Sequence, residues 1–118
     1  MMRVYKMGTG EKYTPFNHFG METEVIFNPG LGCRQANITL STVPKGCGSE
    51  DEVHPSSDQI FYVLDGIMKV YADSKLVAVA GAGDAVFVAA GEPHAVVNED
   101  EGKLSYLAIT VPPLAQTH

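Results

Sequence analysis

Four side chains in this sequence have the chemistry of metal ligands or of acid and base groups. Glu52, His54 and Gln59 lie in one segment, GSEDEVHPSSDQIFYVLDG, and His94 follows 40 residues after His54. Residues two apart on a strand leave the same face of it, so Glu52 and His54 are expected to point to one place. Imidazole and carboxylate groups bind divalent transition metals, and an amide oxygen is a neutral, weaker donor. The pattern predicts a site in which these side chains converge on a metal ion or on an organic ligand.

The rest of the chain supplies β-strands that can position these residues. Apolar and polar residues alternate with a period of two over 36–41 and 104–109, which is typical of strands. Asp65-Gly66 is predicted to close a tight hairpin, because glycine adopts positive φ angles without a Cβ clash. Further runs bounded by turn residues are expected to form strands at 24–27, 60–64, 67–71, 76–79, 85–88 and 94–97. So many short strands indicate an all-β sandwich or barrel.

Two motifs identify the family that the sequence resembles. The first motif of the cupins, G(X)5HXH(X)3,4E(X)6G, has the spacing of Gly46-x5-Glu52-x-His54-x4-Gln59-x6-Gly66. The second, G(X)5PXG(X)2H(X)3N, is met by Gly83-x5-Ala89-x-Gly91-x2-His94-x3-Asn98, with alanine in place of proline. The resemblance implies a double-stranded β-helix, or jelly-roll barrel, built as a single cupin domain over residues 1–118, with motif 1 at about 46–66 and motif 2 at about 83–98.

The resemblance also implies a metal site. By position, the four cupin ligands fall on Glu52, His54, Gln59 and His94. Most metal-binding cupins have three histidines and one glutamate, whereas this chain has Glu52 at a histidine position and Gln59 at the glutamate position. Two histidines and one carboxylate remain, a set that suits one divalent transition metal such as Fe, Mn, Ni, Co or Zn. The same two exchanges are compatible with an emptied site, in which His94 and Gln59 orient an organic ligand by hydrogen bonds.

Three functions are compatible with these residues. The leading hypothesis is a metal-dependent enzyme of dioxygenase, isomerase or lyase type that acts on a small organic substrate. One alternative is a non-enzymatic cupin that binds or senses a small ligand, and another is a metal-free isomerase or lyase with His94 as its acid or base. The candidate substrate contacts are Tyr62, Tyr106 and Arg34. No catalytic base is assigned, since strand alternation aims Asp58 away from the site.

Composition and charge limit the partners. The chain has 8 Lys and Arg residues against 14 Asp and Glu, a formal net charge of −6, and its basic residues are isolated, so a nucleic-acid partner is not expected. It has neither a signal-peptide pattern nor an apolar run long enough to cross a bilayer, so a cytoplasmic protein without a membrane partner is expected. Cys33 and Cys47 are expected to be reduced thiols, and His18 and His118 are expected to face solvent.

Residues 1–22 are expected to form an N-terminal arm. Apolar side chains occur there without a clear strand or helix pattern, at Val4, Tyr5, Phe16, Phe19 and Met21. Single-domain cupins are often homodimers, so the resemblance implies a homodimer. The apolar groups of the arm need a surface to cover, and a partner subunit is one option. Packing of the arm against its own barrel is the alternative.

Overall fold

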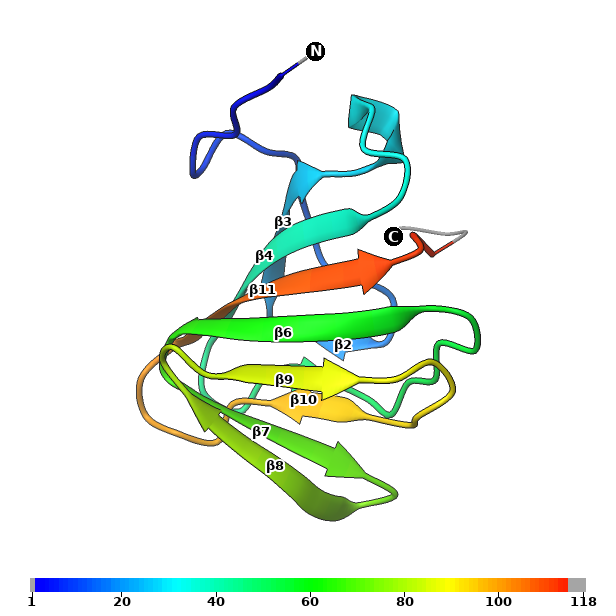
Figure 1. Ribbon diagram of the computed structural model, residues 1–118. Helices are drawn as coiled ribbons and strands as arrows, with labels where there is room; N and C mark the ends of the chain where they lie inside the picture. Colours follow the sequence, from blue (N-terminus) through cyan, green and yellow to red (C-terminus); the bar gives the residue numbers. More distant parts are fainter. Residues whose placement is uncertain (1, 115–118) are drawn as a thin grey trace.

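The protein is built from two antiparallel β-sheets, as its computed structural model shows for residues 2–114 (Figure 1). One sheet has six strands in the spatial order β1 (Lys12–Tyr13), β3 (Glu22–Phe27), β4 (Asn37–Val43), β11 (Leu104–Val111), β6 (Asp58–Asp65) and β9 (Ala85–Val88). The other has five, in the order β2 (His18–Phe19), β5 (Gly48–Ser49), β10 (Ala95–Val97), β7 (Ile67–Ala72) and β8 (Lys75–Gly81). This arrangement confirms the predicted all-β jelly-roll barrel.

Helices contribute little to the described part of the chain. A single 3-10 turn, η1 (Pro29–Leu31), lies between β3 and β4. No helix within residues 2–114 is long and apolar enough to span a membrane.

The chain passes repeatedly from one sheet to the other. Between β4 and β11, only β7 and β8 are consecutive strands that pair with each other, and Asp73 and Ser74 join them with positive φ angles of 51° and 65°. Two positive φ angles in a two-residue loop suit the twist of a hairpin. The prediction that Asp65-Gly66 closes a hairpin is wrong, because β6 and β7 belong to different sheets. Gly66 is required there for another reason: a Cβ at this position would clash with the carbonyl oxygen of Lys103.

The two ends of the barrel have different interiors. At one end, buried apolar side chains pack from both sheets, among them Val43, Val63, Met68 and Leu104, each with 0% of its surface exposed. Toward the other end, the inward positions of β4 are polar, with Asn37, Thr39 and Ser41 buried while their apolar neighbours face outward. The apolar end stabilises the fold, and the polar end surrounds a cavity.

Candidate functional site

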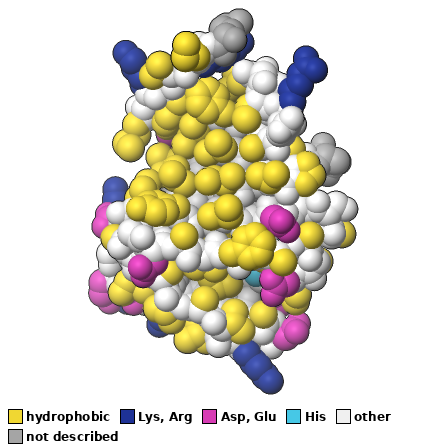
Figure 2. All heavy atoms as spheres, viewed as in Figure 1, with side chains coloured by type: hydrophobic (Ala, Val, Ile, Leu, Met, Phe, Trp, Pro, Cys, Tyr) yellow, Lys and Arg dark blue, Asp and Glu magenta, His cyan; other side chains and the backbone are white. Residues whose placement is uncertain are grey.

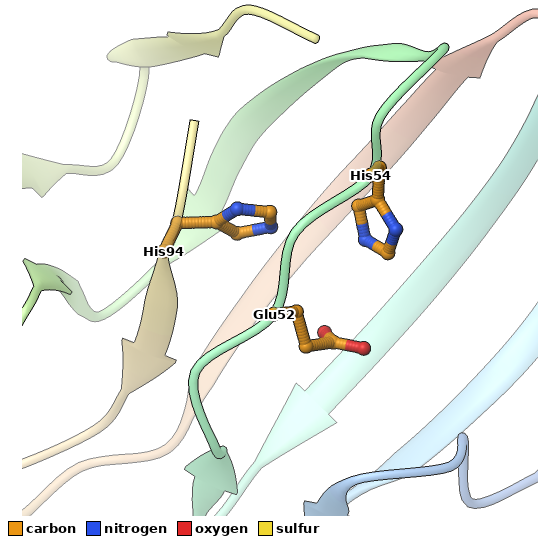
Figure 3. Close-up of side chains that lie close together, drawn as sticks. All are labelled: Glu52, His54 and His94. Atoms are coloured by element: carbon orange, nitrogen blue, oxygen red, sulfur yellow. The ribbon is translucent and has the colours of Figure 1, made fainter. Parts of the chain in front are cut away.

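Glu52, His54 and His94 converge inside the polar end of the barrel (Figure 3). Each offers one ligand atom, and these atoms all lie within 4.8 Å of one another. Glu52 and His54 come from the extended segment before β6, and His94 immediately precedes β10. His94 is 4% exposed and the other two are partly buried. The structure therefore brings together three of the four side chains expected to bind metal.

Backbone pairing explains why residues 40 positions apart meet. Glu52 and His94 form an antiparallel β-bridge, in which each residue's N–H donates to the other's carbonyl oxygen at 2.8 and 2.9 Å. The Gly91 N–H continues this pairing by donating to the His54 carbonyl oxygen at 2.9 Å. Directly opposite residues of an antiparallel pair project to the same face. One short ladder thus aims Glu52 and His94 into the cavity, and the period of two adds His54.

Gln59, the fourth expected ligand, lies next to His94. Its Oε1 is 3.0 Å from His94 Nε2, and its Nε2 donates to Thr110 Oγ1 at 3.0 Å. The other ring nitrogen, His94 Nδ1, lies 3.0 Å from the Glu92 carbonyl oxygen. A neutral imidazole carries one N–H and cannot donate to two carbonyl oxygens at once.

Two arrangements satisfy both contacts of a neutral His94. In the first, Nδ1–H donates to the Glu92 carbonyl, and the lone pair of Nε2 and the oxygen of Gln59 share a cation. In the second, the Gln59 amide is reversed, so that its NH2 donates to His94 Nε2 and its oxygen accepts from the Thr110 hydroxyl. Both keep the His94 proton on Nδ1, but only the first leaves the Nε2 lone pair available to a metal ion.

His18 also belongs to the site, so the expectation that it faces solvent is wrong. It lies in β2, which pairs with β5 opposite Ser49, and its side chain is only 14% exposed. Its Nε2 is 3.4 Å from Glu52 Oε1, and its Nδ1 is 2.8 Å from the Phe16 carbonyl oxygen. A strand of two residues is too short to show an alternating pattern in the sequence, which is why the position of His18 was missed. His118 lies outside the described residues.

Burial adjusts the ionisation of the site. It raises the pKa of Glu52 to about 7, since the cavity disfavours an isolated carboxylate. It lowers the pKa of both His18 and His54, and the nearby His94 lowers the pKa of His54 further. Near neutral pH, His18 and His54 are therefore uncharged with lone pairs available, and Glu52 exchanges its proton readily.

The cavity has a volume of about 340 Å³ and clarifies the expected substrate contacts. Tyr106 lines it and is 3% exposed, and burial raises the pKa of its phenol to about 12, so this group stays protonated. Tyr62 does not line it, because alternation along β6 turns Tyr62 outward, where it is 41% exposed. Arg34 is exposed in the loop before β4 and also lies outside the cavity lining. Of the three, only Tyr106 is placed to touch a bound molecule there.

The donor set fits a divalent transition metal. Two imidazoles and one carboxylate form the combination found in many non-haem metal sites, and Gln59 adds a neutral oxygen beside His94. Metal-ligating histidines usually donate their other ring N–H to a carbonyl or carboxylate oxygen, as His94 Nδ1 does toward Glu92. Small side-chain rotations bring atoms within 4.8 Å to the spacing of ligands about 2.0–2.2 Å from one ion.

Comparisons with known proteins agree with this architecture. A family model described as a cupin domain matches residues 39–110, more than half of the chain. A predicted oxalate decarboxylase from Thermotoga maritima has a TM-score of 0.81 and 22% identity, covering 94% of this chain and 100% of that one. The polyketide cyclase RemF from Streptomyces resistomycificus has a TM-score of 0.83 and 18% identity, covering 98% of this chain and 83% of that one.

A third similar structure is a sugar phosphate isomerase from a cupin superfamily, from Silicibacter pomeroyi, with a TM-score of 0.79 and 18% identity over 94% of this chain and 76% of that one. The comparison with curated proteins finds no match. At these identities the structural likeness shows the fold, which hosts many activities, so function has to be argued from the site.

Proposed function

We propose that this chain, which belongs to the cupin family, is an enzyme that uses one divalent transition metal to act on a small organic substrate inside the barrel. Glu52, His54 and His94 would hold the ion, with the Gln59 oxygen as a fourth contact. The observation that carries the proposal is the convergence of these three ligand atoms within 4.8 Å of one another in a concave site. Fe, Mn, Ni and Zn all suit this donor set.

The residues around the ion have separable tasks. The bound metal would supply Lewis-acid or redox chemistry, which is compatible with a dioxygenase, an isomerase or a lyase. The Glu92 carbonyl holds the proton of His94 on Nδ1 and so keeps Nε2 free to bind. Tyr106 offers a neutral phenol on the cavity wall, able to donate a hydrogen bond to a substrate oxygen.

Metal content tests the proposal directly. Untagged protein is reconstituted anaerobically with Fe(II), Mn(II), Ni(II) or Zn(II), desalted and measured by plasma mass spectrometry. We expect about one ion per chain, lost in the His54→Ala/His94→Ala double variant and retained in Arg34→Ala, since Arg34 lies outside the cavity.

Absence of bound metal under every condition would contradict the proposal. The reversed Gln59 amide would then describe the working site, and a metal-free cupin that binds a ligand, or an isomerase or lyase that uses His94, would take its place. Catalysis that survives chelation but not His94→Ala would identify the enzymatic form of that alternative.

The proposal extends to a homodimer formed through the six-stranded sheet. Over β4, β11, β6 and β9, two cross-strand rows on its outer face contain no charged side chain (Figure 2), although the row through Leu40 continues into Glu24 on β3. We name them the outer patch: Ile38, Ile109, Ile60 and Phe87 in one row, and Leu40, Leu107, Tyr62 and Ala85 in the other. An uncharged flat face can meet its own copy without charge repulsion, as a two-fold interface requires.

The N-terminal arm remains a second candidate for the interface. Its two short strands, β1 and β2, pair with β3 and β5 of the same chain. Three of its apolar side chains nevertheless stay exposed, Val4 at 84%, Phe16 at 79% and Phe19 at 44%, so a partner subunit could cover them beside the outer patch.

A further inference from the structure

One wall of the cavity is built from three cross-strand rows on the inner face of the six-stranded sheet. The row at the open end consists of Gln59, Thr110 and Asn37. The row at the closed end contains Tyr106, Ser41 and Thr23. Between them lie Phe61, Ala108 and Thr39. The two outer rows are polar, and the middle row carries small side chains at β11 and β4, which leaves room above them for a bound molecule.

The hydrogen bonds of the two polar rows are not equally complete. In the closed-end row, Thr23 Oγ1 and Ser41 Oγ lie 2.8 Å apart, and Ser41 also bonds to Tyr106. In the open-end row, a chain of contacts runs from His94 to Gln59 and on to Thr110, but it stops there. Asn37 is only 8% exposed, and its Oδ1 has no hydrogen-bond partner.

An unpartnered buried amide oxygen is costly. Leaving a buried acceptor without a donor costs about 1–3 kcal/mol, so such groups are usually paired with protein, water or ligand. Asn37 lines the cavity, two strands away from Gln59 in the same row. A molecule that lies across Ala108 and Thr39 can provide the missing donor while its other end reaches His94.

The charge of the lining narrows the chemistry of that molecule. Among the described residues that line the cavity there is no lysine or arginine, and the acidic side chain there is Glu52. We call Glu52, His54 and His94 the metal cluster. A carboxylate or phosphate on the part of the ligand farthest from it, near Asn37, would meet hydroxyl and amide groups but no positive charge. Burying an uncompensated charge is strongly unfavourable, whereas hydroxyl groups can both donate to and accept from these residues.

The lining also provides an apolar surface. The rings of Phe61 and Tyr106 pack edge to face with centroids 5.5 Å apart, and Ala108 lies beside Phe61 in the middle row. A molecule with hydroxyl groups along one edge and an apolar face would satisfy both surfaces. This description fits a sugar ring, through its C–H face, and a hydroxylated aromatic ring, through its π face.

We propose that the cavity binds an uncharged, hydroxylated ring compound, with Asn37 accepting a hydrogen bond from a hydroxyl group at the end remote from the metal cluster. Asn37 is then a specificity-determining residue that selects against ligands carrying a carboxylate or phosphate at that end. This inference deepens the proposed function, because it names the substrate class of the same site.

Matched ligand pairs test this selectivity in zinc-loaded protein. D-glucose is compared with D-glucuronate and D-glucose 6-phosphate, and catechol with protocatechuate, by calorimetry and by ligand-observed NMR. We expect at least one neutral ligand to bind at least about tenfold more tightly than its acidic counterparts. Binding of D-glucose would identify the ring as a sugar, and binding of catechol would identify it as an aromatic ring. Equal or tighter binding of the acids, or no binding of either neutral ligand, would overturn the proposal.

Variants at Asn37 test the assigned contact. Asn37→Leu keeps the approximate shape and removes the acceptor, so we expect neutral ligands to bind about tenfold more weakly. Thr42→Val on the outward side of the same strand is the matched control, with unchanged affinity expected. Asn37→Asp keeps an acceptor if the leucine variant does not fold, and should retain neutral ligands while weakening acids further. Unchanged affinity in a folded Asn37→Leu protein would overturn the assignment.

Metal content measured on the same samples separates the two proposals. Neutral-ligand binding that depends on Asn37 but persists in protein with the wild-type sequence that takes up no metal would leave this inference standing and remove the metal enzyme. Stoichiometric metal without selectivity for neutral ligands would support the metal enzyme and remove the proposed substrate class.

Discussion

The carboxylate of this site occupies a position that its surroundings favour. Glu52 is 16% exposed and lies against His18, whereas Gln59 is buried among Thr110 and His94. An ionised glutamate at the more buried position 59 would lose more hydration than one at position 52. The exchange of glutamate for glutamine at position 59 and of histidine for glutamate at position 52 thus keeps one anionic donor but moves it to the more exposed of the two places.

The pKa of Glu52 predicts how metal affinity depends on pH. An ion must displace the proton of Glu52, whose pKa burial raises to about 7, while the lowered pKa values of His18 and His54 leave these groups unprotonated. We expect zinc affinity to rise about fivefold from pH 6 to 7 and about twofold from pH 7 to 8, because one proton is released. Competition titrations measure this dependence. Glu52→Gln should bind more weakly and show a flatter profile; an equally steep profile would refute the assignment.

His18 is expected to position Glu52. Its Nδ1 lies 2.8 Å from the Phe16 carbonyl oxygen and its Nε2 lies 3.4 Å from Glu52 Oε1, so the ring packs against the carboxyl group and restricts its rotation. Loss of such an outer contact typically lowers metal affinity by about 10- to 100-fold. We therefore predict that His18→Ala weakens zinc binding by about tenfold while the thermal stability of the metal-free protein changes little. A purely structural role would instead lower the melting temperature and leave the affinity intact.

At the scale of elements, the site depends on how closely the segment after β4 approaches β10. Gly48 lies opposite Val97, and a Cβ on Gly48 would clash with the backbone carbonyl of Val96. The Glu52–His94 bridge continues the same pairing. Any separation of these two segments would move Glu52 and His54 away from His94.

Two glycine variants separate site geometry from general stability. Gly48→Ala should lower the free energy of unfolding by about 2 kcal/mol and also weaken metal binding, because it forces β5 away from β10. Gly66→Ala forces a comparable clash with Lys103 at the opposite end of β6, so it should destabilise the fold and spare metal affinity. Denaturant unfolding and zinc titration of both variants provide the measurement. An equal loss of zinc affinity in both variants would contradict the dependence of metal binding on the approach of β5 to β10.

The sequence predicted where the strands lie better than it predicted which strands pair. Period-two alternation located β4 and β11, and runs bounded by turn residues located β6 and β9, because both signals are local; motif spacing placed Glu52, His54, Gln59 and His94 together. Which sheet a strand joins depends on contacts distant in the sequence, so the Asp65-Gly66 turn was misread as a hairpin. The alternation that aims Asp58 away from the site also turns Tyr62 outward, so Tyr62 could have been excluded from the sequence. Only the fold shows that His18 lies against Glu52.

At the scale of the whole molecule, part of the six-stranded sheet has polar side chains facing the interior and apolar side chains facing outward. On β4 the polar residues Asn37, Thr39 and Ser41 face the interior, while Ile38 and Leu40 face outward. The polar residues inside line the cavity. Apolar residues outside need a different explanation, because the outer patch continues across β11, β6 and β9, with Phe87 61% and Tyr62 41% exposed. Contiguous exposed apolar surface on a sheet usually marks an interface.

A charge placed in the outer patch should therefore dissociate a dimer. Tyr62→Glu puts a carboxylate near the centre of the patch, and in a two-fold interface each copy would bury it against the other, so we expect the weight-average mass to fall from dimer to monomer in sedimentation at micromolar concentration. Val77→Glu is the matched control, since Val77 is 60% exposed on β8 of the other sheet and should leave the dimer intact. The cavity lies inside the barrel, so Tyr62→Glu should keep its metal. A wild-type protein that stays monomeric across the concentration series, or a Tyr62→Glu protein that still dimerises, would rule out this face.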